Sequence, residues 1–306
     1  MSYHTSVLLA EVIENLVTAK DGLYLDGTLG GGGHTSHLLK ALEEKGHIIG
    51  MDQDKEAIEL CQEKFKGESR LTLCKSRFSK MENFVGTRSL DGVVLDLGVS
   101  SRQLDSDPRG FSFESHRPLD MRMDAMGDVT ALDYLHDVTE EELARVMWQN
   151  SDVKSSRRLA VAIKSLLPDY KDTTLIHVAL DKVFPKGLAN KNRMLAMIFQ
   201  AIRMEVNEEL KEVTQGLDAA VKLVKKGGRI CVITFHSVED RLVKRTFQKW
   251  EKSCHCPPRS PLCTCGGNQR KIKKVFKKPL LPSSAEISRN GRSRSAKLRV
   301  VEKVAA

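Results

Sequence analysis

A run of four glycines follows an acidic residue near the N-terminus, and these residue types at this spacing could form a ligand site. Asp26 ends a short apolar stretch, and Gly30–Gly33 and His34 follow it closely. Glycines let the backbone adopt positive φ and let a ligand approach the main chain. A second apolar stretch ends at Asp52, about 20 residues further on, the spacing at which a carboxylate can bind ribose hydroxyls. The pattern predicts a nucleoside cofactor.

The acidic residue before the glycines indicates which cofactor fits. The loop lacks the Gly-x-Gly-x-x-Gly spacing of dinucleotide sites, and a pyrophosphate would be repelled by the carboxylate of Asp26. S-adenosylmethionine has no phosphate and carries an ammonium and a sulfonium group. The sequence therefore favours S-adenosylmethionine over a nicotinamide dinucleotide, although Asp26 could instead simply cap the start of the loop.

A further acidic residue, Asp96, ends another apolar stretch and precedes a long polar loop. At such a strand end a carboxylate can contact the cofactor or accept a hydrogen bond from a substrate N–H, or it can cap the loop. The loop carries Phe111 and Phe113 among polar and basic residues. These rings could stack on a nucleic-acid base, or they could pin the loop to the core.

A late apolar stretch ends at His236 and Ser237. Adjacent His and Ser residues suggest a hydrolase, but the chain has no Gly-x-Ser-x-Gly turn around Ser237, and neighbours in sequence do not face each other as a catalytic pair must. We expect this strand end, with His236, to line the substrate side of the pocket.

Four of the seven cysteines lie in two Cys-x-Cys pairs. In a protein of the cytosol, paired cysteines favour a metal over disulfides. The spacing departs from the usual Cys-x2-Cys, so a zinc clip and a reduced, cysteine-rich loop both stay open. The pairs are Cys254 with Cys256 and Cys263 with Cys265.

The elements that must position these residues alternate between strand and helix from residue 23 to about 100. That alternation predicts a parallel sheet wrapped by helices. Helical periodicity then dominates residues 108–205, after which the α/β pattern resumes. We therefore expect an α/β fold with a Rossmann-like sheet formed by residues 1–107 and 206–306, and an inserted all-helical domain at 108–205. The expected strands are 23–26, 47–52, 71–74, 91–97 and 229–236, with late candidates at 273–276 and 296–301. The expected helices are an amphipathic one near the N-terminus, 36–42, 55–65, 131–136, 140–149, 157–167, 174–183, 192–206 and 208–226.

The charge is unevenly distributed along the 306 residues. Residues 241–306 hold 18 Lys and Arg against 3 Asp and Glu, whereas the preceding residues are slightly acidic. A basic C-terminal segment of this kind suggests a polyanionic partner, and beside a nucleoside cofactor it favours nucleic acid. No apolar run approaches the ~20 residues that span a bilayer, and the N-terminus lacks the features of a secretory signal. We expect a cytoplasmic protein.

Several sequence blocks, in order over nearly the whole chain, resemble the bacterial 16S rRNA (cytosine-N4)-methyltransferases of the RsmH (MraW) type. The resemblance implies a class I S-adenosylmethionine-dependent methyltransferase with an inserted helical domain, acting on a cytosine in the decoding centre of the small ribosomal subunit. The blocks are 4–9, 30–34, 96–101, 109–113, 118–124, 199–201, 235–241 and 293–299.

The resemblance also implies site residues by position. It places the methyl donor against residues of the glycine loop and of the strand ends, and 16S rRNA in the substrate position. The cofactor contacts that it implies are Gly32, Gly33, His34, Asp52, Phe78, Asp96 and Gln103.

For the reaction, we expect direct methyl transfer to the exocyclic amine of cytosine, with Asp96 orienting the amine and Phe111 or Phe113 holding the unstacked base. Two rivals stay open: a nicotinamide oxidoreductase, which Asp26 disfavours, and a non-catalytic RNA-binding assembly factor. The oligomeric state is undetermined, a homodimer being one option.

Overall fold

We describe a computed structural model, in which residues 6–86, 89–105, 108–113, 116–254, 256–257 and 263–305 are placed. The chain forms two compact units. The sheet unit comprises Met1–Gly98 and Leu210–Ala306, and the helical unit comprises Val99–Glu209. The sequence predicts these boundaries at 107/108 and 205/206. The helical unit begins earlier because Val99 and Leu104 already pack against its core.

The sheet unit is built on a seven-stranded sheet with the order β3-β2-β1-β4-β5-β7-β6. The first five strands pair in parallel, and β7 runs antiparallel to both β5 and β6. This arrangement confirms the expected Rossmann-like α/β class with a helical insertion. The strands are β1 (Leu23–Asp26), β2 (His47–Asp52), β3 (Leu71–Lys75), β4 (Leu90–Asp96), β5 (Val224–Thr234), β6 (Ile272–Lys274) and β7 (Lys297–Lys303).

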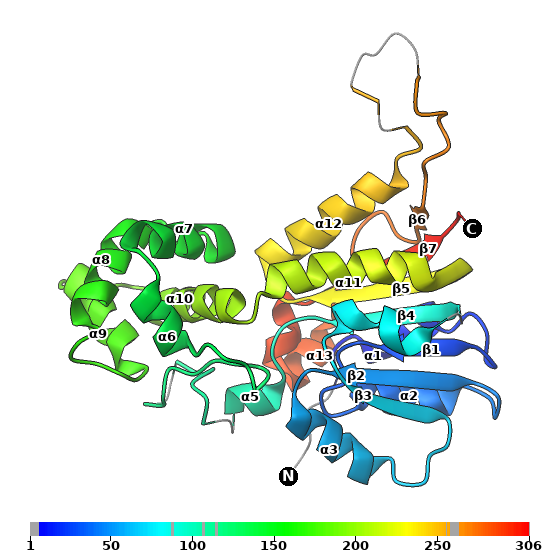
Figure 1. The fold of residues 1–306 in the computed structure, drawn as a ribbon, viewed down its shortest axis with the longest axis horizontal. Coiled ribbons are helices and arrows are strands. Elements are labelled where there is room, and N and C mark those ends of the chain that lie inside the picture. The colour runs from blue at the N-terminus through cyan, green and yellow to red at the C-terminus, as the bar shows by residue number, and fades with distance from the viewer. Residues whose placement is uncertain are drawn as a thin grey trace. The chain divides into compact units, whose positions relative to one another are not determined.

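Helices cover both faces of this sheet (Figure 1). Successive residues of a strand point to opposite faces, so Leu25 packs with α11 and α12, whereas its neighbour Tyr24 packs with α1 and α2. The same alternation separates Ile49 from Ile48 in β2. The helices and turns of the sheet unit are α1 (Leu9–Leu16), α2 (Gly33–Ala41), α3 (Lys55–Lys64), η1 (Phe78–Lys80), α4 (Glu82–Val85), α11 (Glu209–Leu223), α12 (Ser237–Glu251), α13 (Ser284–Arg289) and η2 (Gly291–Ser295).

The helical unit encloses a core of its own. Thr130 and Thr139 cap two of its helices, each accepting a hydrogen bond from a backbone N–H in the first turn, which satisfies donors that a helix start leaves unpaired. Its longest helix, α10, packs against α6, α7 and α9. The helices are α5 (Ser101–Asp105), α6 (Ala131–Asp137), α7 (Glu140–Ser151), α8 (Ser156–Leu166), α9 (Thr174–Val183) and α10 (Lys191–Val206).

The largest difference from the sequence prediction lies where α11 meets β5. The helix expected to reach Lys226 ends at Leu223, and β5 begins at Val224, which pairs with Leu90 of β4. The expected turn at Gly227 is instead a shift of register inside the strand, with φ of +83° at that glycine. Pairing with β4 therefore outweighs the local turn signal. No helix in the described part of the chain is long and apolar enough to cross a membrane.

Candidate functional site

The glycine loop joins β1 to α2 and has one packed side and one open side. Gly32 has φ of +67°, and a Cβ built on it would lie 2.6 Å from the ring of Phe65. Gly30 has φ of +50°, and a Cβ there would meet nothing nearer than the carbonyl oxygen of Thr28, at 4.0 Å. Positive φ is accessible to glycine at little cost. The loop thus leaves room for a ligand beside Gly30.

Asp26 holds the loop from inside. Its side chain is 1% exposed, and its carboxylate accepts hydrogen bonds from the backbone N–H of Thr28 (3.2 Å) and the hydroxyl of Thr35 (2.7 Å). Burial raises the pKa of Asp26 above its usual value. These contacts correspond to the capping role that the sequence analysis left open.

Asp52 connects the loop to the end of β2. One carboxylate oxygen accepts a hydrogen bond from the N–H of Gly30 at 2.8 Å, and the other from the N–H of Asp54 at 2.9 Å. Each carboxylate oxygen has a second lone pair, so Asp52 can also accept hydrogen bonds from two hydroxyl groups. Burial raises the pKa of this carboxyl to about 6.

His34 and Asp96 form the centre of the site. Nε2 of His34 lies 3.4 Å from one carboxylate oxygen of Asp96, and His34 is 4% exposed. Burial alone would lower the pKa of His34, but the neighbouring Asp96 and the charge of Asp26 outweigh it and raise that pKa. The second oxygen of Asp96 is buried and has no hydrogen-bond partner among the described residues. Such an atom is costly unless something donates to it, so the site fits a ligand that carries N–H or O–H groups.

Threonine contributes to the site in a way that the sequence analysis missed. The hydroxyl of Thr28 accepts a hydrogen bond from the backbone N–H of Asp96 at 2.6 Å, which ties the glycine loop to the end of β4. The signal available was Asp-Gly-Thr after an apolar run, because Asp and Thr in such turns commonly bond to nearby backbone.

Phe78 lies in the core of the sheet unit beside the loop. A Cβ on Gly27 would lie 2.9 Å from the Cβ of Phe78, and a Cβ on Gly216 of α11 would lie 2.2 Å from its ring. The two glycines therefore make the space that the ring occupies. Any contact of Phe78 with the cofactor stays a prediction.

His236 caps α12. Its Nδ1 accepts from the backbone N–H of Glu239 at 3.4 Å, and its Nε2 lies 3.0 Å from the carboxylate of the same residue. It follows β5, whose Ile233 pairs with Asp96, so sheet register brings it toward the same edge as Asp96. The structure gives His236 a capping role, and its catalytic role stays a prediction.

Gln103 belongs to the helical unit and forms a capping box with Ser100. The side-chain Oε1 of Gln103 accepts a hydrogen bond from the backbone N–H of Ser100 at 3.0 Å, and the backbone N–H of Gln103 donates to the Ser100 hydroxyl at 3.3 Å. This reciprocal pair is the Ser-x-x-Gln signature of a helix start. The contact of Gln103 with the cofactor stays a prediction.

Phe111 and Phe113 both pack in the core of the helical unit. Phe111 is 5% exposed, with the guanidinium of Arg109 5.5 Å from its ring centre. Phe113 is partly buried and meets Phe199 edge to face at 6.3 Å, and its carbonyl oxygen contacts the ring of His177 at 2.8 Å. The structure thus favours the second alternative, in which the rings pin the loop.

We expect Phe111→Ala to lower the free energy of unfolding of the helical unit by about 3–5 kcal/mol, because it removes a buried aromatic ring. Urea unfolding with limited proteolysis of residues 99–209 measures this. Phe113→Ala, at a partly buried position, is the control and should cost less. If Phe111→Ala were as stable as the wild type and abolished methyl transfer, the ring would be a base-stacking residue instead.

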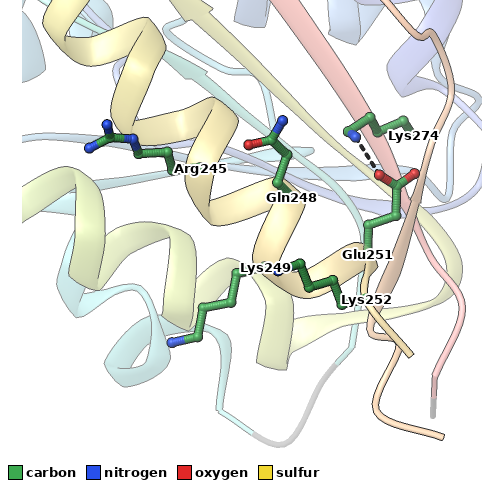
Figure 2. Close-up of a pocket in the computed structure, with 6 residues that line it drawn as sticks. All are labelled: Arg245, Gln248, Lys249, Glu251, Lys252 and Lys274. Carbon is green, nitrogen blue, oxygen red and sulfur yellow. Dashed lines mark hydrogen bonds and ion pairs between the residues drawn. The ribbon is translucent and has the colours of Figure 1, made fainter. Parts of the chain in front are cut away.

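A basic hollow of about 470 Å³ lies along α12 in the sheet unit. Figure 2 shows basic side chains from successive turns of this helix, with Lys274 of β6 ion-paired to Glu251 beside them. Cations so arranged suit the phosphates of a nucleic acid. The lining residues are Arg245, Gln248, Lys249, Glu251, Lys252 and Lys274.

The chain is similar to known proteins over its full length. The MraW methylase family matches residues 1–304. The chain belongs to this family. Three curated relatives are the ribosomal RNA small subunit methyltransferase H 2 of Agathobacter rectalis, at 43% identity, and the ribosomal RNA small subunit methyltransferases H of Caldicellulosiruptor saccharolyticus and Clostridioides difficile, each at 41%. The matches cover 98–99% of this chain and 98–100% of the relatives.

Membership of the MraW methylase family decides between the enzyme classes that the sequence left open. The chain is a methyltransferase with S-adenosylmethionine as its methyl donor, not a nicotinamide oxidoreductase. The open side of the glycine loop at Gly30 and the carboxylate of Asp52 fit that donor, whose ribose carries two hydroxyl groups.

The raised pKa of Asp52 predicts a pH-dependent affinity for the methyl donor. The ionised carboxylate accepts two hydroxyl hydrogen bonds, and the protonated form accepts fewer. Affinity should therefore be full above about pH 7 and fall as the pH drops through about 6, by at most about tenfold per pH unit. Calorimetric titration with S-adenosylhomocysteine between about pH 5 and 8 measures this.

Asp52→Asn is the control, because an amide does not titrate in this range. The variant should bind more weakly at neutral pH, with a flatter profile. A slope that persists in Asp52→Asn would assign the titration to another group of the loop, Asp26 or His34, and a wild-type affinity independent of pH would contradict the prediction.

Proposed function

We propose that this chain methylates the exocyclic N4 of a cytidine in 16S rRNA, at the decoding centre of the small ribosomal subunit. The names of the curated relatives support small-subunit rRNA as the substrate. The observation that carries the proposal is the buried carboxylate oxygen of Asp96 that has no partner among the described residues. An exocyclic amine is an N–H donor that such an oxygen would accept.

Asp96 would act on the amine rather than on the methyl group. The lone pair of the amine is delocalised into the cytosine ring, so the nitrogen is a weak nucleophile. A hydrogen bond from N4 to Asp96 would orient the amine and stabilise the positive charge that develops on nitrogen as its bond to the methyl carbon forms and the bond from that carbon to sulfur breaks. The methylated nitrogen would then lose one proton, which the carboxylate of Asp96 could accept. When bound, S-adenosylmethionine supplies a methyl group on a positively charged sulfur. Alignment of the two reactants provides much of the rate.

The glycine loop would hold the donor in place for this step. Gly32, Gly33 and His34 would contact it from the loop, and Asp52 would accept hydrogen bonds from its ribose. The basic hollow of α12 would bind rRNA phosphates, which makes RNA affinity fall steeply with salt. His236, which follows β5, would line the substrate side of the site.

The test is methylation of small ribosomal subunits taken from cells that lack this protein. Purified protein and isotope-labelled S-adenosylmethionine should produce labelled N4-methylcytidine, identified by mass spectrometry of the nucleosides. Free 16S rRNA is the comparison substrate. Label on C5 of cytosine or on another nucleoside would contradict the proposal. Binding of the subunit without any label would contradict the proposed target nucleotide.

A further inference from the structure

Four cysteines, Cys254, Cys256, Cys263 and Cys265, lie between the end of α12 and the start of β6, outside the candidate site described above. The Sγ atoms all lie within 4.8 Å of one another. Cys254 and Cys263 are exposed, and Cys256 and Cys265 are partly buried.

The distances between these sulfurs indicate a shared centre. Sγ of Cys263 lies 3.7 Å from that of Cys254, 4.0 Å from that of Cys256 and 3.6 Å from that of Cys265. Cys265 is in turn 3.6 Å from Cys254. Zn–S bonds of about 2.3 Å in a tetrahedron place the sulfurs about 3.8 Å apart. A disulfide instead joins two sulfurs at about 2.05 Å. It would account for only one of the three sulfur neighbours of Cys263.

The surrounding backbone holds this cluster as a metal site requires. The N–H of Thr264 donates to the sulfur of Cys256 at 3.3 Å, a contact that stabilises a metal-bound thiolate. Gly266 and Gly267, directly after the second pair, have φ of +79° and +66°. They turn the chain sharply around the sulfurs, and a Cβ at Gly267 would lie 3.9 Å from Sγ of Cys263.

Backbone hydrogen bonds close the base of the segment. The N–H of Gln269 donates to the carbonyl of Ser253 at 2.9 Å, and the N–H of Lys271 donates to that of Trp250 at 2.8 Å. The two Cys-x-Cys pairs are thus brought side by side at the end of a paired stem. This explains how pairs with an unusual spacing can supply four ligands to one ion.

We propose that Cys254, Cys256, Cys263 and Cys265 bind one Zn²⁺ in a structural site. Four sulfur ligands fill a tetrahedral zinc and leave no open position for substrate or water, so the ion is not part of the methyl-transfer chemistry. It would fasten the end of α12 to the approach to β6, next to the basic hollow. Lys252 and Lys274, which precede and follow the segment in the sequence, both line that hollow.

Metal content tests the proposal directly. The protein, purified without chelator or a metal-affinity tag, should contain about one zinc per chain by plasma mass spectrometry. Cys263→Ser should lose most of that zinc, because a hydroxyl is a poor substitute for a thiolate. Cys74→Ala, which removes a buried cysteine of β3 outside the cluster, is the matched control and should keep it. Equal zinc in Cys263→Ser and the wild type would overturn the proposal.

A spectroscopic measurement keeps the test independent of folding and of activity. Wild-type protein is first stripped of metal with a chelator. Added Co²⁺ should then give the strong visible absorption bands of tetrahedral cobalt bound to thiolates, and Zn²⁺ should abolish them. Absence of these bands, or disulfides among the four cysteines in freshly prepared protein, would overturn the proposal. Affinity for S-adenosylhomocysteine should stay within about twofold after zinc removal, as expected for a closed structural site; a loss of that affinity would contradict the structural role.

Discussion

Asp96→Ala is expected to reduce the rate of methyl transfer at saturating substrates by about 10²–10³, the loss typical of removing one preorganised polar group from the reacting centre. The carboxylate lies at the end of β4, with one buried oxygen that nothing in the described residues satisfies. That oxygen is the acceptor that we assign to the substrate amine. Single-turnover methylation of small ribosomal subunits measures the effect.

A slower rate in Asp96→Ala must be distinguished from weaker binding of the cofactor. Affinity for S-adenosylhomocysteine, measured by calorimetry, should change far less than the rate. Asp96→Asn keeps an acceptor oxygen and removes the charge, so it should retain more activity than Asp96→Ala. If the rate were normal at saturating S-adenosylmethionine while affinity fell, Asp96 would be a cofactor residue only.

Gly32→Ala is expected to abolish tight binding of the methyl donor and to destabilise the sheet unit. The substitution forces φ of +67° on an alanine and drives its Cβ to 2.6 Å from the ring of Phe65 and 3.0 Å from Sγ of Cys61. The left-handed conformation costs roughly 1–2 kcal/mol, and overpacking costs about 1–3 kcal/mol more. Thermal unfolding and calorimetric titration measure the two effects.

Gly67→Ala separates the two causes. Gly67 has φ of +84°, and a Cβ at this position would have no atom within 4 Å, so this control bears the backbone strain without the clash. It should lower stability slightly and leave cofactor affinity unchanged. Equal effects from Gly32→Ala and Gly67→Ala would mean that contact with Phe65 does not shape the loop.

The sequence predicts the strands of the sheet well where an apolar run is followed directly by a polar residue that marks its end. Asp26, Asp52 and Asp96 each end an apolar run, and each ends a parallel strand at the same edge of the sheet. Because parallel strands end together, three acids that are distant in sequence become neighbours of one loop. The coarse position of the site follows from that pattern alone.

The roles of individual residues depend on packing that the pattern does not contain. A carboxylate can meet a ligand or a backbone N–H, and only the structure reveals that Asp26 is buried and accepts hydrogen bonds from Thr28 and Thr35. An aromatic ring in a polar loop can stack on a base or enter a core, and Phe111 enters the core. The end of α11 likewise depends on pairing between Val224 and Leu90, which lie far apart in sequence.

The place of β7 between β5 and β6 governs the order in which the two units can be completed during translation. Residues 99–209 leave the ribosome as one uninterrupted stretch and can fold before residues 210–306 are made. The sheet unit must wait, because β5 keeps an unpaired edge until Lys297–Lys303 arrives to cover it. During that interval the edge of β5 lacks its partner strand, and an unpaired strand edge can pair with other chains.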